Sequence, residues 1–262
     1  MKSFYFLHHS IAPLMRAFNC IAFFWVGQDT TLPSLLVRSI RLAFGPDFCV
    51  YQLSDRQTPA VAGVTHVKHL KLSPHIMVAR LEAYAALPQT GATLLLDADM
   101  LVLRAFALPP LNTNEVGITH RGARDTIRFS PREWAEFPEF TDKDSSDVMP
   151  YIYSFIYVES SLLFVRQLIA LRKLPKRFHR WYGDQMSLKS ELDAPDRFRI
   201  QTLDIDQFNR TVRSEIEFRE VFLSTEAPYI VHFKGPESKS AMARSLSLIQ
   251  SRHGHVPGSS GT

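Results

Sequence analysis

Strand and helix signals alternate through the first 110 residues of this 262-residue chain, and this alternation limits the possible folds more than any other feature. In chain order the sequence predicts a strand at 20–26, a helix at 33–44, strands at 48–53 and 65–70, a helix at 75–87 and a strand within 92–103. This β-α-β-β-α-β order favours an open, mainly parallel α/β sheet flanked by helices. Ligands of such sheets bind beyond the carboxyl ends of the strands. Polar residues stand at three such ends, in 27–29, at Asp55 and in 97–99.

After residue 110 the pattern is less regular. The sequence predicts an edge strand at 116–120, a strand over 156–165, a short helix ending near Leu174, a helix at 185–192, strands at 198–205 and 228–235, and a helix at 236–252. A polar stretch as long as 121–150 is typical of a functional or disordered loop. We expect one catalytic domain over residues 1–252 and a disordered Gly- and Ser-rich tail over 253–262.

Composition limits the possible binding partners of the chain and its possible cellular compartment. The formal net charge is +4, which fits an anionic ligand or a membrane surface but is too weak to indicate nucleic acid. Cys20 and Cys49 lie in apolar runs and are expected to be buried free thiols in a reducing compartment. The first 15 residues are too polar for a signal-peptide core, and 20–26 is far shorter than the roughly 20 residues of a spanning helix. We therefore expect a cytoplasmic protein.

The segment LLLDADMLVL carries the sharpest chemical signal. Asp97 and Asp99 follow three leucines, and in an extended segment residues i and i+2 point to the same side. Two carboxylates at a strand end suit Mg²⁺ or Mn²⁺, with phosphate oxygens or water as the other ligands. The alternative is a solvated turn after a strand, although buried strands seldom end in two close carboxylates without a counter-charge.

A second class of enzyme shares this pattern. Haloacid-dehalogenase-like phosphatases also place Asp-x-Asp after an apolar strand, with the first aspartate as nucleophile. Their motif usually has Thr or Val two residues after the second aspartate and lies near the start of the chain. Here Leu101 takes that position almost one hundred residues into the chain, and Ser187 and Leu188 do not supply the later carboxylate that this chemistry needs after Asp184.

Two later motifs add candidate residues. His232 in HFKG stands at the end of an apolar run, where it can complete a metal site while the turn at Gly235 brings backbone near a phosphate. A histidine in this position is otherwise a structural residue. Asp184 in WYGDQ opens a predicted helix, so a helix cap is its alternative role.

Taken together, these motifs resemble those of the GT-A-fold glycosyltransferases. The resemblance is greatest to glycosyltransferase family 8, the group of glycogenin and the bacterial lipooligosaccharide galactosyltransferases. It covers about residues 18–240 and rests, in chain order, on CIAFFWVGQD, Arg80, LLLDADM, YIYVESSLLFVR, Gly183-Asp184-Gln185 and HFKG. It implies a Rossmann-like nucleotide-sugar-binding half at about 18–110 and an acceptor half at about 111–240.

The resemblance also implies a metal-assisted donor site. By this resemblance Asp97, Asp99 and His232 would hold Mn²⁺ (or Mg²⁺) on the diphosphate of a nucleotide sugar, with Asp97 also touching the donor. Arg80 would reach the donor near the sugar or the diphosphate.

Further donor contacts follow from the same resemblance. Gly27, Gln28 and Asp55 would line the nucleoside pocket, while Gly235 and Lys239 would contact the diphosphate. Lys239 stands seven residues after the histidine, where the family usually has six.

Catalysis is assigned by the resemblance to Asp184 and Gln185, which would face the sugar ring. The implied reaction moves a hexose from a nucleotide diphosphate sugar, with UDP as the expected nucleotide, to a hydroxyl acceptor such as a glycan or glycolipid, with retention of configuration. The segment Glu159-Ser160-Ser161 replaces the usual Asn-x-Gly, so the donor sugar stays undefined. A phosphatase of the dehalogenase type and a nucleotide-sugar-binding protein without turnover are the alternative functions.

A basic and aromatic cluster lies outside these motifs. Its cations are Arg172, Lys173, Lys176, Arg177 and Arg180. A solvated face is one interpretation. The other is peripheral contact with an anionic membrane, in which Phe178 and Trp181 insert at the interface.

Overall fold

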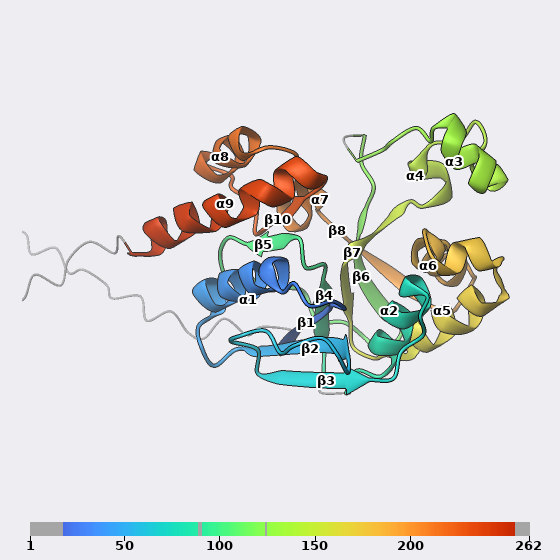
Figure 1. Cartoon of the computed structure of the whole chain (residues 1–262), viewed down its shortest axis with the longest axis horizontal. Helices are drawn as coiled ribbons and strands as arrows, with labels where there is room; N and C mark the ends of the chain where they lie inside the picture. Colours follow the sequence, from blue (N-terminus) through green and yellow to red (C-terminus); the bar gives the residue numbers. More distant parts are fainter. Residues whose placement is uncertain (1–17, 89–90, 124, 255–262) are drawn as a thin grey trace, which may run out of the picture.

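The computed structural model describes residues 18–88, 91–123 and 125–254. These residues form two β-sheets with strand orders β3-β2-β1-β4-β7-β6-β8 and β5-β10-β9, flanked by helices (Figure 1). The elements are β1 (Cys20–Phe24), α1 (Thr31–Phe44), β2 (Cys49–Asp55), β3 (His66–Leu70), α2 (Ile76–Ala85), β4 (Thr93–Leu96), β5 (Met100–Val102), β6 (Glu115–His120), α3 (Pro131–Glu136), the 3₁₀ helix η1 (Pro138–Phe140), α4 (Ser145–Val148), β7 (Tyr151–Val158), α5 (Leu162–Lys173), the 3₁₀ helix η2 (Lys176–His179), α6 (Gly183–Leu192), β8 (Arg199–Leu203), α7 (Ile205–Phe208), β9 (Arg210–Val212), α8 (Glu215–Leu223), β10 (Ile230–Phe233) and α9 (Pro236–Gly254).

The first part of the chain has the predicted β-α-β-β-α-β order. β1 pairs in parallel with both β2 and β4, and β2 pairs in parallel with β3. All five residues of β1 are buried because helices cover both faces of the sheet. Ile21 and Phe23 pack in the core that holds the apolar side of α1, whereas Ala22 and Phe24 pack in the core beneath α2.

The strand expected within 92–103 is in fact two strands. β4 belongs to the large sheet, and β5 pairs antiparallel with β10 in the small sheet. The chain leaves one sheet and enters the other through a turn at 97–99. The two acidic residues therefore mark the junction between the sheets.

Two further strands differ from the expectation. β6 is an interior strand, because it pairs with both β7 and β8, and is not an edge strand. The strand expected over 156–165 ends at Val158, and α5 begins at Leu162. Buried Leu163, Phe164, Gln167 and Leu171 follow helical spacing, so helical packing determines the structure of this segment.

The long polar stretch 121–150 contains short helices rather than a continuous loop. A capping box closes the start of α3, because the Ser130 hydroxyl accepts from the backbone N–H of Glu133 and the Glu133 side chain accepts from the backbone N–H of Ser130. The region 205–223 also holds α7, β9 and α8, which the sequence patterns did not predict.

Other expectations have mixed outcomes. Cys20 and Cys49 are free thiols on paired residues of β1 and β2, with Cys20 buried and Cys49 half-buried. None of the helices that the structure describes combines the length and the apolar character needed to cross a membrane. The predicted C-terminal helix extends to Gly254, and the rest of the expected disordered tail lies outside the described residues, as do residues 1–17.

Candidate functional site

The turn that joins the two sheets is fixed by backbone contacts on both sides. The N–H of Asp97 donates to the carbonyl of Ser154 on β7 at 3.1 Å. The carbonyl of Asp99 accepts from the N–H of Phe233 on β10 at 2.9 Å. The sequence argument placed the two carboxylates on one side of an extended strand. Their closeness instead arises from a turn held between β7 and β10.

Three potential metal ligands meet at this turn. Asp97, Asp99 and His232 each offer one ligand atom, and these atoms all lie within 4.8 Å of one another. His232 comes from β10, where it is paired with Met100 next to the turn. Carboxylate oxygens with one imidazole nitrogen suit Mn²⁺ or Mg²⁺, so the residue types fit a divalent cation.

Positive groups surround the second carboxylate. Lys239 Nζ lies 2.6 Å from one oxygen of Asp99, and His232 Nε2 lies 3.3 Å from the other. Burial acts to raise the pKa of Asp99, but His232 and Lys239 outweigh burial and hold this pKa well below its usual range. Lys239 lies near the start of α9, and this helix begins directly after Gly235. The φ of Gly235 is +92°, in the region that favours glycine.

Arg80 on α2 joins the first carboxylate to a buried one. Its guanidinium lies 3.2 Å from Asp97 and 2.9 Å from Asp184, and it stands over the ring of Tyr153 at 5.4 Å. Asp184 is only 3% exposed. Burial raises the pKa of Asp184, and Arg80 acts in the opposite direction without fully cancelling it. The site therefore contains a carboxylate–guanidinium–carboxylate bridge.

Asp184 and Gln185 are neighbours at the start of α6, but their side chains have different partners. A Cβ on Gly183 would lie 2.0 Å from the carbonyl oxygen of Phe178. Only glycine therefore allows the start of α6 to lie this close to the backbone of η2. The Asp184 carboxylate accepts from the backbone N–H of Gln185 at 2.8 Å. The side-chain oxygen of Gln185 accepts from Arg121 at 2.9 Å. Of the two, only Gln185 is among the described residues that line the cleft beside the acidic turn.

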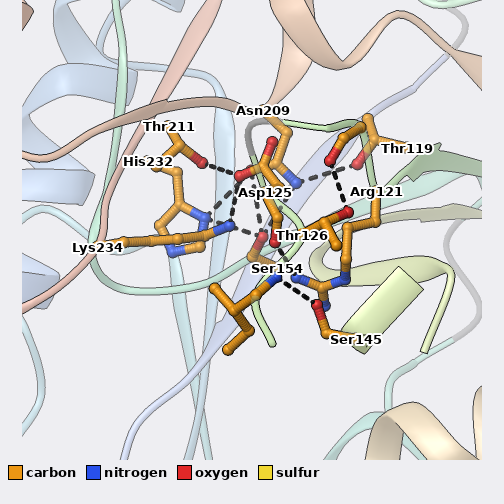
Figure 2. Close-up of polar contacts among 12 residues, drawn as sticks. Thr119, Arg121, Asp125, Thr126, Ser145, Ser154, Asn209, Thr211, His232 and Lys234 are labelled. Atoms are coloured by element: carbon orange, nitrogen blue, oxygen red, sulfur yellow. Dashed lines mark hydrogen bonds and ion pairs between the residues drawn. The ribbon is translucent and has the colours of Figure 1, made fainter. Parts of the chain in front are cut away.

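This cleft has a volume of about 410 Å³, and Figure 2 draws several of its lining residues, among them Arg121, Ser154 and His232. Its described lining is Arg80, Asp97, Arg121, Asp125, Ile127, Ser145, Met149, Ile152, Tyr153, Ser154, Tyr182, Gln185, Arg213, His232, Lys234 and Gly235. The structure thus brings five of the sequence-predicted site residues to one cleft. Of the other predicted residues, Asp184 contacts Arg80, Asp99 contacts His232, and Lys239 contacts Asp99.

The residues predicted for the nucleoside form a separate group. The backbone N–H of Gly27 donates to the hydroxyl of Thr58 at 2.9 Å, and that hydroxyl donates to Asp55 at 2.7 Å. Gln28 donates to the carbonyl of Gln57 at 2.8 Å. The hydrogen bonds from Thr58 lower the pKa of Asp55. This group follows the carboxyl ends of β1 and β2, the same edge at which β4 leads into the acidic turn.

Comparison with known proteins identifies the architecture. No family model and no curated protein matches the chain. Among solved structures, the galactosyltransferase LgtC in complex with donor and acceptor sugar analogs is 14% identical, with a TM-score of 0.53 over 88% of this chain and 95% of LgtC. The chain has the GT-A fold. The bifunctional glycosyltransferase WbbM is 13% identical, with a TM-score of 0.53 over 92% of this chain and 53% of WbbM. The glycosyltransferase GlyE of Streptococcus pneumoniae is 12% identical, with a TM-score of 0.53 over 89% of this chain and 62% of GlyE.

The predicted GT-A fold is thereby confirmed, but its cleft contains residues that the sequence did not single out. Asp125 accepts from Lys234 Nζ at 2.8 Å and from the hydroxyl of Thr211. Burial acts to raise the pKa of Asp125, and Lys234 outweighs it, so the pKa is lowered. Asn209 lies beside His232. No sequence pattern pairs these residues, because each contact joins segments that are distant in the chain.

The basic cluster differs from the expectation in one respect. Phe178 is buried, and its ring lies 5.2 Å from that of Phe137, so it is not available to insert at an interface. Trp181 is 56% exposed. Arg172 pairs with Glu82, and Arg177 pairs with Glu139, so two of the five cations have acidic partners within the fold.

Proposed function

We propose that this chain is a metal-dependent glycosyltransferase. It would move a hexose from a nucleotide diphosphate sugar, with UDP as the expected nucleotide, to a hydroxyl acceptor such as a glycan or glycolipid, with retention of configuration. The observation that carries the proposal is the convergence of Asp97, Asp99 and His232 at the junction of the two sheets in a GT-A fold. The LgtC structure, which shares that fold, contains donor and acceptor sugar analogs.

The proposed cation site would stabilise the leaving group. A divalent cation on Asp97, Asp99 and His232 would supply positive charge where negative charge gathers on the departing diphosphate. Lys239 lies 2.6 Å from Asp99, so its ammonium group stands next to the same site and would bind a diphosphate oxygen. Gly235 lines the cleft with no Cβ, which lets the backbone approach that group.

The cleft walls support the proposed division of the chain. Arg80 and Asp97 come from the expected donor half, at 18–110, whereas Gln185 and His232 come from the expected acceptor half, at 111–240. We therefore propose one catalytic domain with its reaction centre between the two halves. The group of Gly27, Gln28 and Asp55 at the neighbouring strand ends would bind the nucleoside.

Gln185 is the better placed of the two proposed catalytic residues. It lines the cleft, and its amide is oriented by Arg121. It would therefore touch the sugar, while Asp184 would act on the reaction through Arg80. A second LgtC structure carries glutamate in place of an active-site glutamine. That glutamine of LgtC shows that an amide side chain belongs to the active site of one protein with this fold.

The alternative functions have less support. A dehalogenase-type phosphatase would use Asp97 as a nucleophile, but its Oδ1 is engaged by Arg80 at 3.2 Å, and the three compared folds are glycosyltransferases. A binding protein without turnover would have the same cleft. Only an assay of transfer separates it from an enzyme.

The deciding experiment is a donor screen. The protein is incubated with a panel of UDP- and GDP-sugars and Mn²⁺, and release of UDP or GDP is measured with and without EDTA. We expect release from a UDP-sugar that stops when EDTA removes the metal. Release of inorganic phosphate from sugar phosphates would support the phosphatase, and tight UDP binding without release from any donor would support the binding protein.

We also propose a cytoplasmic protein with peripheral contact to an anionic membrane. Leu162, Val165 and Ile169 are 40–52% exposed and lie at helical spacing on one face of α5. Arg166 and Lys173 are exposed on the same helix, and α5 contains no acidic residue. An apolar stripe among cations suits a surface of anionic lipid.

The vesicle test separates this contact from a solvated face. The protein should co-sediment with vesicles of anionic lipid at low salt and detach as salt rises. Ile169→Ser should weaken the binding, whereas Ile216→Ser on α8, where the side chain is 71% exposed, should not. Equal binding to neutral vesicles, or none to anionic vesicles, would contradict the proposal.

A further inference from the structure

We propose that Asn209 is a positioning residue that fixes the tautomer of His232, so that the Nε2 lone pair points at the acidic turn. This inference rests on the proposed function, because it gives the metal site a preset imidazole ligand. Asn209 makes no contact with the acidic turn that the structure records, and it would act only through the histidine. It lies at the end of α7, directly before β9.

The two nitrogens of His232 face different partners, and Figure 2 shows those of Nδ1. Nδ1 lies 3.1 Å from the side-chain oxygen of Asn209 and 3.1 Å from the hydroxyl of Ser154. Nε2 lies 3.3 Å from Asp99. A cation shared with Asp97 and Asp99 needs an unprotonated Nε2, and the proton of the neutral ring must then be on Nδ1.

The amide of Asn209 is itself oriented by two hydroxyls. Its Nδ2 donates to Thr119 at 3.0 Å and to Ser154 at 3.0 Å. Both amide hydrogens are therefore used, and the oxygen is the atom that faces His232. An amide oxygen only accepts, so a ring nitrogen 3.1 Å away is stabilised when it carries a hydrogen. The Ser154 hydroxyl donates its hydrogen to the Asn209 oxygen at 3.2 Å, so that hydrogen does not compete for the Nδ1 lone pair. The network thus favours the Nδ1–H form.

Burial makes this preference strong. Asn209 and Thr119 are fully buried, Ser154 is 3% exposed and His232 is 6% exposed. Asn209 and Thr119 have no exposed surface, and a buried polar group without a partner is costly. The partners also come from β6, β7 and β10, so Asn209 connects the large sheet to the small one at the point where the ring must be held.

Asp99 acts in the opposite direction. A carboxylate 3.3 Å from Nε2 attracts a hydrogen on that nitrogen, which would block the ligand position. With Asn209 present, the Nδ1 hydrogen has an acceptor and Nε2 keeps its lone pair. Without Asn209, we expect the Nε2–H form to gain population. Bound metal would then have to displace that hydrogen, and metal affinity would fall.

Mn²⁺ titration of matched variants tests the inference. Asn209→Ala removes the acceptor and should weaken Mn²⁺ binding about 10- to 100-fold, the usual range for the loss of a group that orients a metal-bound histidine. Asn209→Asp keeps the acceptor, and the hydroxyls of Thr119 and Ser154 can rotate to donate to it. This variant should bind Mn²⁺ within about threefold of the wild type. Gln52→Ala, which removes a fully buried amide on β2, is the control for general loss of stability.

A metal-free spectrum gives a second readout. Proton–nitrogen NMR of the neutral imidazole should show His232 as the Nδ1–H tautomer in the wild type and a shift toward Nε2–H in Asn209→Ala. The signal is assigned by its loss in His232→Gln. Unchanged Mn²⁺ affinity in Asn209→Ala, or an Nε2–H tautomer in the wild type, would overturn the inference. A wild type without Mn²⁺ binding but with the Nδ1–H tautomer would instead overturn the metal site of the proposed function.

Discussion

Replacing Asp99 with asparagine is expected to lower Mn²⁺-dependent transfer or donor hydrolysis by at least about 10²-fold. The substitution removes one of the three ligand groups and leaves His232 and Lys239 without the carboxylate that faces them. A cation would then meet uncompensated positive charge. Asp97→Asn should act in the same direction. The fold should persist, since the backbone bonds that hold the turn do not involve either side chain.

Turnover, Mn²⁺ affinity and melting temperature should be measured on the same preparations. Asp47→Asn is the matched control, because it removes an exposed carboxylate from a turn far along the chain from the site. It should leave turnover and Mn²⁺ dependence unchanged. Near wild-type turnover in Asp97→Asn or Asp99→Asn would contradict the metal site, and unfolding of both variants would show that the carboxylates are structural.

The sequence predicted the elements whose local pattern of polarity indicates one structure, and it missed the features that depend on strand pairing. The apolar run of β1 and the amphipathic pattern of α1 each indicate one structure, and both elements were predicted. The run 92–103 is equally apolar on both sides of its acidic residues, so polarity does not reveal that β5 joins another sheet. The interior place of β6 depends on β8, which comes about 80 residues later. Pairing of that kind leaves no local signal.

The candidate site shows the same division. Asp97, Asp99 and His232 stand in short motifs, and the structure brings them together. Asp125 and Lys234 are 109 residues apart, and Asn209 and His232 are 23 apart. The residues that orient the motif residues are buried polar groups from other strands, and their types are common throughout the chain. Their role is visible only in the contacts.

Arg80 offers the largest expected effect on stability. Arg80→Met would leave Asp184, whose side chain is 4% exposed, as a buried carboxylate without its partner. Loss of one partner of a buried pair costs about 3–5 kcal/mol, which corresponds to a fall of roughly 6–20 °C in melting temperature for a chain of this size. Arg172→Met is the matched control on the protein surface. The Arg172 side chain, which pairs with Glu82, is 58% exposed. Loss of this pair should therefore cost at most about 1 kcal/mol.

The double variant Arg80→Met, Asp184→Asn shows whether the pair acts as a unit. Neutralising both partners removes the unpaired buried charge, so the double variant should be more stable than Arg80→Met alone by about 1–3 kcal/mol. Additive losses would mean that Arg80 and Asp184 contribute independently, and the bridge would then be incidental.

The cycle also tests the role of Asp184 in transfer. If Asp184→Asn keeps the wild-type melting temperature and UDP affinity but lowers kcat by about 10²-fold, Asp184 itself acts on the reacting sugar. If it lowers the melting temperature with kcat intact, Asp184 is a structural residue, and the contact with the sugar belongs to Gln185.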